Sequence, residues 1–77
     1  MTYTATLELD LTGLTCPMPL LKTKQALNKL ATGDTVKVVA TDPASMRDFQ
    51  VFAEQSGNKL LESNQADGRY IYLLLKK

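Results

Sequence analysis

Apolar and polar residues alternate along the first part of the chain. From Tyr3 to Leu11 the odd positions are apolar and the even positions are threonine or acidic. Residues 34–41 repeat the alternation, and residues 69–76 carry apolar side chains on both faces. A period of two is typical of strands. We therefore predict a strand in each of these three stretches.

A fourth and less regular strand is expected over residues 59–65. Asp67-Gly68, which follows it, is typical of a tight hairpin turn into the last strand. The two apolar sets of the last strand are Tyr70, Tyr72 and Leu74 on one face, and Ile71, Leu73 and Leu75 on the other. One of these sets is expected on an uncovered face of the sheet, together with Val39.

Helical spacing separates the strands in two places. We predict a first helix over residues 17–30, capped at its end by Gly33. A second helix starts either with Asp42 as its N-cap or, in the manner of a capping box, with Ser45 as its N-cap and Asp48 three residues later. It ends near residue 56, with Gly57 just beyond. The expected core faces are Leu20, Thr23, Leu27, Leu30 and Ala31 in the first helix, and Met46, Phe49, Phe52 and Ala53 in the second.

The resulting order, βαβαββ, predicts an α+β fold in a single domain over residues 1–77. A right-handed crossover makes the first two strands parallel, and the second helix packs most simply on the same face as the first. We expect a two-layer α/β sandwich, in which two helices cover one face of a four-stranded mixed sheet.

Composition narrows the classes of function. Nine basic and eight acidic residues give a formal charge of +1, which argues against direct nucleic-acid binding. One cysteine and no histidine leave no internal disulfide, no Cys-His catalytic pair and no ligand set for a metal. A lone cysteine and an N-terminus without a signal pattern indicate a cytoplasmic protein. With 77 residues, a surface site is expected rather than a large enclosed cavity.

The only cysteine lies between the first strand and the first helix, in Gly13-Leu14-Thr15-Cys16-Pro17-Met18-Pro19. Gly13 is expected to permit a turn that a residue with a Cβ would resist. Pro17 and Pro19 suit the first and third helical positions, where no N–H group is needed. Cys16 then becomes an extended N-cap residue. The helix dipole is expected to lower the pKa of the Cys16 thiol, with Asp10 opposing this if it points toward the sulfur.

Two interpretations of Cys16 stay open on this chemistry alone. It is either a small buried hydrophobe, as free cysteines often are, or a working sulfur atom. If the thiolate is used, an adduct on its sulfur cannot be resolved within the chain, because there is no second cysteine. The remaining role is to accept a group and transfer it to another protein. The candidates for partner docking or for holding an anion are Met18, Leu21, Lys22, Asp42 and Arg47. For Lys22 alone, a plain solvated helix face is the simpler interpretation.

The residues 9–19, with their Gly-x-x-Cys-Pro-x-Pro core, resemble the signature of the TusA/SirA-like family of sulfur-carrier proteins. The resemblance extends to Thr32-Gly33-Asp34, to residues 41–48 and to the closing strand. It implies the βαβαββ fold and a covalent persulfide on Cys16, with no other cofactor. It also implies a sulfur donor, such as a cysteine desulfurase or a rhodanese-like protein, and an acceptor sulfurtransferase or a membrane transporter of sulfur compounds.

The resemblance leaves the pathway open among tRNA thiolation, sulfur oxidation and thiosulfate use. We therefore expect a persulfide carrier of sulfurtransferase type rather than a stand-alone enzyme with multiple turnover. The first alternative is a thiosulfate-cleaving partner of a transporter, with Lys22 or Arg47 holding the anion. The second is a non-catalytic interaction module that uses the open sheet face, with Tyr72 as its test residue.

Overall fold

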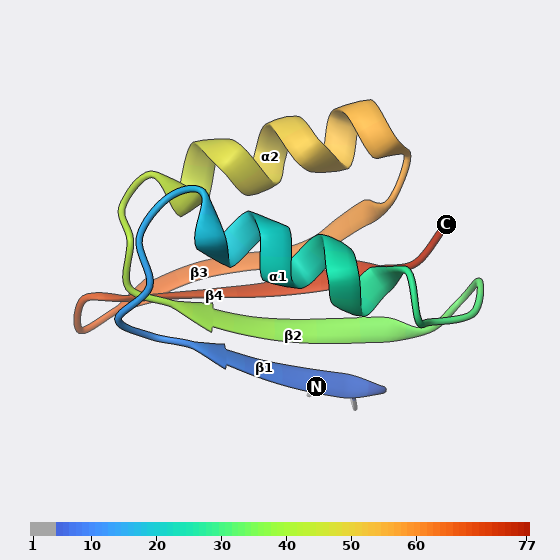
Figure 1. Cartoon of the computed structure of the whole chain (residues 1–77), viewed down its shortest axis with the longest axis horizontal. Helices are drawn as coiled ribbons and strands as arrows, with labels where there is room; N and C mark the ends of the chain where they lie inside the picture. Colours follow the sequence, from blue (N-terminus) through green and yellow to red (C-terminus); the bar gives the residue numbers. More distant parts are fainter. Residues whose placement is uncertain (1–4) are drawn as a thin grey trace.

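A computed structural model of the chain describes residues 5–77. The elements in chain order are β1 (Leu7–Leu11), α1 (Met18–Leu27), β2 (Thr35–Ala40), α2 (Ser45–Ser56), β3 (Lys59–Ala66) and β4 (Arg69–Leu75). Both helices lie on one face of a four-stranded sheet, α1 above β2 and α2 above β3 and β4 (Figure 1). The predicted two-layer α+β architecture is confirmed.

The strand order in the sheet is β1-β2-β4-β3. β1 and β2 are parallel, with Leu11 opposite Ala40 at their ends, whereas β4 is antiparallel to both of its neighbours. The carboxyl ends of β1 and β2 therefore lie side by side. As a result, the loop that carries Cys16 emerges next to the loop that leads into α2.

The Asp67-Gly68 hairpin is present as predicted, because both residues have positive φ and Ala66 pairs with Arg69 across the turn. Positive φ at both central residues is typical of the turn type that matches the twist of a hairpin. β3 also contains an irregularity between Leu60 and Glu62. This irregularity explains why the alternation of its sequence is weak.

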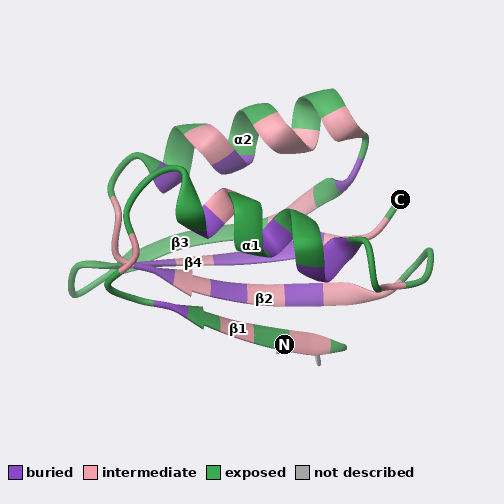
Figure 2. Cartoon of the chain, in the orientation of Figure 1, coloured by how far each residue is buried: buried purple, intermediate pink, exposed green. Residues whose placement is uncertain are grey.

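The core lies between the sheet and the helices, as the band of buried residues in Figure 2 shows. Tyr70, Tyr72 and Leu74 belong to this core. The face of the sheet away from the helices therefore carries the alternate residues of β4, Ile71, Leu73 and Leu75, together with Val39 of β2. Ile71, Leu75 and Val39 are half-buried there, whereas Leu73 is only 4% exposed. Tyr72 stacks on Phe49 of α2, with ring centroids 4.4 Å apart. Tyr72 therefore does not lie on the open face, and its choice as the test residue for that face was wrong.

α1 is shorter than predicted. It ends at Leu27 with Asn28 as C-cap, so Gly33 does not cap it and instead lies in the turn before β2. Ala31, expected in the core face, is exposed because the helix has already ended. The other predicted core positions, Leu20, Thr23, Leu27 and Leu30, are buried or half-buried.

α2 differs from the prediction at its first turn. Its N-cap is Ala44, without a side-chain cap, while Gly57 has φ +83° at the C-cap. Met46 was expected in the core but is 48% exposed. The inward position of this turn belongs to Ser45, which is buried. A prediction based only on apolar residues therefore assigned Met46 to the core in place of Ser45.

β1 begins at Leu7, and Ala5 and Thr6 precede it outside the strand, although the Thr6 amide still bonds the Thr35 carbonyl at 2.9 Å. The predicted start at Tyr3 lies outside the described residues. β2 has one residue less at each end than predicted.

Candidate functional site

Cys16 lies in the loop between β1 and α1, and its side chain is exposed. Gly13 begins this loop with φ +81°, a conformation that favours glycine. Its amide donates a hydrogen bond of 2.8 Å to the hydroxyl of Thr41, which follows β2. The predicted turn at Gly13 is present, and it ties the Cys16 loop to the neighbouring β2–α2 loop.

Asp42 holds the backbone of Cys16. The Cys16 amide donates a hydrogen bond of 2.7 Å to Oδ2 of Asp42, while Oδ1 accepts one of 3.2 Å from the amide of Ala44. One carboxylate thus joins two loops that are 26 residues apart in sequence. The sequence suggested Asp42 as a helix cap or docking residue, whereas its carboxylate anchors the cysteine loop and an Asx turn.

Asp48 holds the sulfur. The Cys16 thiol donates a hydrogen bond to Oδ2 of Asp48, with 3.3 Å between the sulfur and oxygen atoms. Asp48 lies in the first turn of α2. The spacing from Ser45 to Asp48 was visible in the sequence, but it indicated a capping box. No local signal connects this carboxylate to a cysteine 32 positions earlier.

The expectation of a lowered pKa for Cys16 is wrong. The hydrogen bond to Asp48 raises the pKa of the thiol above its ordinary value, with further contributions from partial desolvation and from repulsion by Asp48 and then Asp42. Asp10, the residue suspected of opposing ionisation, instead accepts bonds from the amide and hydroxyl of Thr12. These bonds lower the pKa of Asp10.

α1 begins at Met18, one residue later than predicted, so its start lies between the two prolines. Pro17 is the N-cap and Pro19 is the second helical residue, so Cys16 precedes the cap and is not the cap itself. The Cys16–Pro17 peptide bond is cis. Pro19 is buried, and its carbonyl accepts a hydrogen bond of 2.8 Å from the buried hydroxyl of Thr23. Pro19 thereby fixes the first turn of α1 against the core.

Three docking candidates lie exposed on α1, as predicted. Met18 is 39% and Leu21 43% exposed, and Lys22 is also exposed. Arg47 lies on α2 and is not part of the same helix face. Within residues 5–77, neither Lys22 nor Arg47 forms a salt bridge, and the same holds for Asp42 and Asp48.

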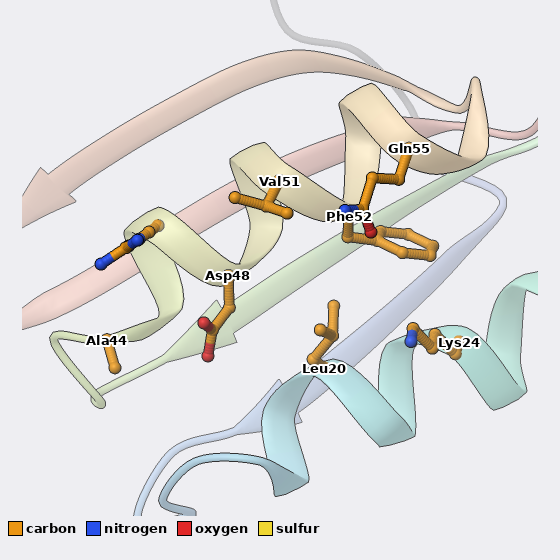
Figure 3. A pocket seen from close by; sticks show the side chains of 8 residues that line it. Leu20, Lys24, Ala44, Asp48, Val51, Phe52 and Gln55 are labelled. Atoms are coloured by element: carbon orange, nitrogen blue, oxygen red, sulfur yellow. The ribbon is translucent and has the colours of Figure 1, made fainter.

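A groove of about 520 Å³ runs between the two helices (Figure 3). Asp48 and Ala44 lie toward one end of it, and Lys24 and Gln55 toward the other. Leu20, Val51 and Phe52 form its apolar lining, and the Lys24 ammonium lies 5.5 Å from the centre of the Phe52 ring. The carboxylate that contacts Cys16 is therefore also part of the groove wall.

Taken together, the fold and the site define a small α+β domain that presents one exposed thiol at the carboxyl edge of two parallel strands. The family model described as Sulfurtransferase TusA matches residues 7–77. The chain belongs to the TusA family, and the resemblance stated from the cysteine motif is confirmed.

Individual relatives agree with this family. The chain is 46% identical over 69 residues to the sulfur carrier protein TusA of Allochromatium vinosum, covering 90% of this chain and 91% of that one. It is 39% identical over 77 residues to the sulfur carrier protein TusA of Pseudomonas aeruginosa, covering 100% and 98% of the two chains. A crystal structure of a SirA-like protein from Desulfitobacterium hafniense superposes with a TM-score of 0.82 at 28% identity, over 91% of this chain and 96% of that one.

Over residues 5–77, neither helix has the length and apolar character needed to cross a membrane.

Proposed function

We propose that the protein is a cytoplasmic sulfur carrier whose Cys16 takes up sulfane sulfur as a persulfide and passes it to an acceptor protein. The observation that carries the proposal is the exposed thiol of the chain's only cysteine, held in a fixed loop by Asp42. The names of the relatives, sulfur carrier proteins, support the same role. The donor is a cysteine desulfurase, a rhodanese-like protein or a sulfur compound.

The transfer of sulfane sulfur from a donor persulfide to Cys16 needs no external oxidant or reductant. The Cys16 thiol loses its proton, and its sulfur forms a bond to the outer sulfur of the donor persulfide. The S–S bond of the donor breaks, its electron pair stays on the donor sulfur, and that thiolate takes up a proton. One sulfur atom moves, and neither a metal ion nor a nucleic acid takes part. The acceptor is a sulfurtransferase or a membrane transporter of sulfur compounds.

The experiment is intact-mass analysis after incubation with polysulfide, or with a cysteine desulfurase and cysteine. We expect the addition of one sulfur atom that a reductant removes. The Cys16→Ser variant keeps the fold, because the side chain is exposed, and it gains no such mass. A wild-type protein that never carries reductant-labile sulfur on Cys16 would refute the carrier role.

Thiosulfate cleavage by Cys16 alone has less support from the local charges. The charged side chains that contact Cys16 are the carboxylates of Asp42 and Asp48, and they repel a dianion. Arg47 and Lys22 are available as cations only outside these contacts. Multiple turnover of thiosulfate in the absence of a partner would favour this second candidate instead.

A further inference from the structure

We propose that Asp48 is a positioning residue that keeps Cys16 as a protonated, oriented thiol in the free carrier. This inference rests on the proposed function only for the biological use of the thiol, because the hydrogen bond between Cys16 and Asp48 is observed in the structure. The consequence is a carrier whose sulfur reacts slowly with small electrophiles and oxidants while it is free.

The direction of the hydrogen bond is the first argument. A carboxylate can only accept, so the bond of 3.3 Å between the Cys16 sulfur and Asp48 exists only while the sulfur carries its proton. Ionisation of the thiol removes this bond and places two negative charges at contact distance. The contact therefore favours the thiol over the thiolate and fixes the direction in which the sulfur points.

The second argument is the set of charges around the sulfur. From α2 it faces Asp48, and from the β2–α2 loop it lies near Asp42, whose carboxylate is bonded to the Cys16 amide. From its own side it lies near the start of α1, whose first turn contains no acidic residue and whose positive dipole end favours a thiolate. Across the described residues, no salt bridge neutralises either carboxylate. The hydrogen bond to Asp48 raises the pKa of Cys16, and partial desolvation and repulsion by the carboxylates of Asp48 and Asp42 act in the same direction.

The third argument is that Asp48 is held in place independently of Cys16. It projects from the first turn of α2, and the first residue of this helix, Ser45, is fixed in the core by a hydrogen bond of 2.7 Å between its hydroxyl and that of Tyr72. The next residue, Phe49, is fully buried. A carboxylate on a fixed backbone can restrain a side chain on a loop, whereas two mobile side chains would not restrain each other.

The test is the pH dependence of Cys16 alkylation by iodoacetamide in the full chain. In Asp48→Asn, the carboxamide has the same shape but no charge, and it can donate to a thiolate. We expect the midpoint of the alkylation profile to move to lower pH and the rate near neutral pH to rise several-fold. The gain in thiolate exceeds the loss of intrinsic nucleophilicity that accompanies a lower pKa. Asp48→Glu, which restores the charge, is expected to move the midpoint back toward that of the wild type.

Glu54→Gln is the matched control, because it makes the same change of net charge on an exposed position of the same helix. It is expected to leave the midpoint unchanged. A midpoint that is unchanged or higher in Asp48→Asn, or that moves equally in both variants, would overturn the proposal. If Asp48→Asn unfolds in the assay range, Asp48→Ser, with a residue suited to the first turn, decides by the same criterion.

The two proposals fail in different ways. Alkylation reports on the thiol whether or not it ever carries sulfur, so a shifted midpoint without any persulfide would sustain the role of Asp48 and refute the carrier. A persulfide that forms on the wild type and on Asp48→Asn at the same rate from polysulfide, with equal alkylation midpoints, would sustain the carrier and refute the role of Asp48.

Discussion

The hydroxyl oxygens of Ser45 and Tyr72 lie 2.7 Å apart in the core, beneath the first turn of α2. Ser45 is 1% exposed and Tyr72 is fully buried. This contact joins the start of α2 to β4, at the point where the helix also provides Asp48 to the cysteine site. Stability of the core and geometry of the site are therefore linked through one buried hydrogen bond.

Removal of this hydrogen bond is expected to destabilise the fold. In Tyr72→Phe, the Ser45 hydroxyl stays buried without its partner, and loss of such a partner costs about 1–3 kcal/mol. Urea unfolding measures the free energy. Tyr70→Phe is the control, since the Tyr70 hydroxyl has no hydrogen-bond partner within residues 5–77, and it is expected to cost less. Equal costs for the two variants would contradict the importance of the contact.

Tyr72 also leads to a prediction about the stability of the fold at alkaline pH. Burial raises the pKa of Tyr72, and the hydrogen bond to Ser45 only partly opposes this. The folded state thus holds the phenolic proton more tightly than the unfolded state, whose tyrosines titrate at about 10. The contribution of the Tyr72 phenol to the free energy of unfolding is fully present below that pH and is lost as the pH rises above it.

Unfolding free energies measured across the alkaline range check this prediction. The wild type is expected to lose stability more steeply than Tyr72→Phe, which has no phenolic proton at this position. Parallel curves for the two proteins would show that Tyr72 does not contribute to the alkaline loss.

Much of this arrangement could be predicted from the sequence. Alternation and helical spacing determine which elements form, because burial of one face dominates the choice of each residue there. The position of Cys16 at the strand-to-helix junction follows from the same pattern together with Gly13 and the prolines. The βαβαββ order then limits the topology to few alternatives.

The contacts that set the chemistry of Cys16 could not be predicted in this way. Asp42 and Asp48 reach the cysteine loop from 26 and 32 residues away, and their roles depend on the side-by-side ends of β1 and β2. A local argument sees only the helix start that follows Cys16 and therefore gives a thiol pKa shifted in the wrong direction. The inward rotation of Ser45 in place of Met46 likewise depends on a hydroxyl partner in β4.

Salt is expected to increase the reactivity of Cys16. Part of the raised thiol pKa comes from repulsion by Asp48 and Asp42 at an exposed site, and dissolved ions screen charges at such sites. Raising the concentration of potassium chloride should move the midpoint of iodoacetamide alkylation to lower pH. Asp42→Asn, which lacks one of the two charges but keeps an acceptor for the Cys16 amide, should show a smaller movement. A midpoint that rises with salt would contradict this account of the charges.

Gly13→Ala is expected to separate the position of the sulfur from overall stability. At φ +81° a side chain strains the backbone by about 1–2 kcal/mol, although no atom lies within 4 Å of the added methyl group. Gly33→Ala is the matched control, because Gly33 has φ +93° and equally open surroundings but lies in the turn before β2. Both variants should unfold at similarly lower urea concentrations. Only Gly13→Ala should change the alkylation rate of Cys16, since relief of its strain displaces the loop that Asp42 and Thr41 hold. Equal alkylation rates in the two variants would show that the Gly13 turn does not position the thiol.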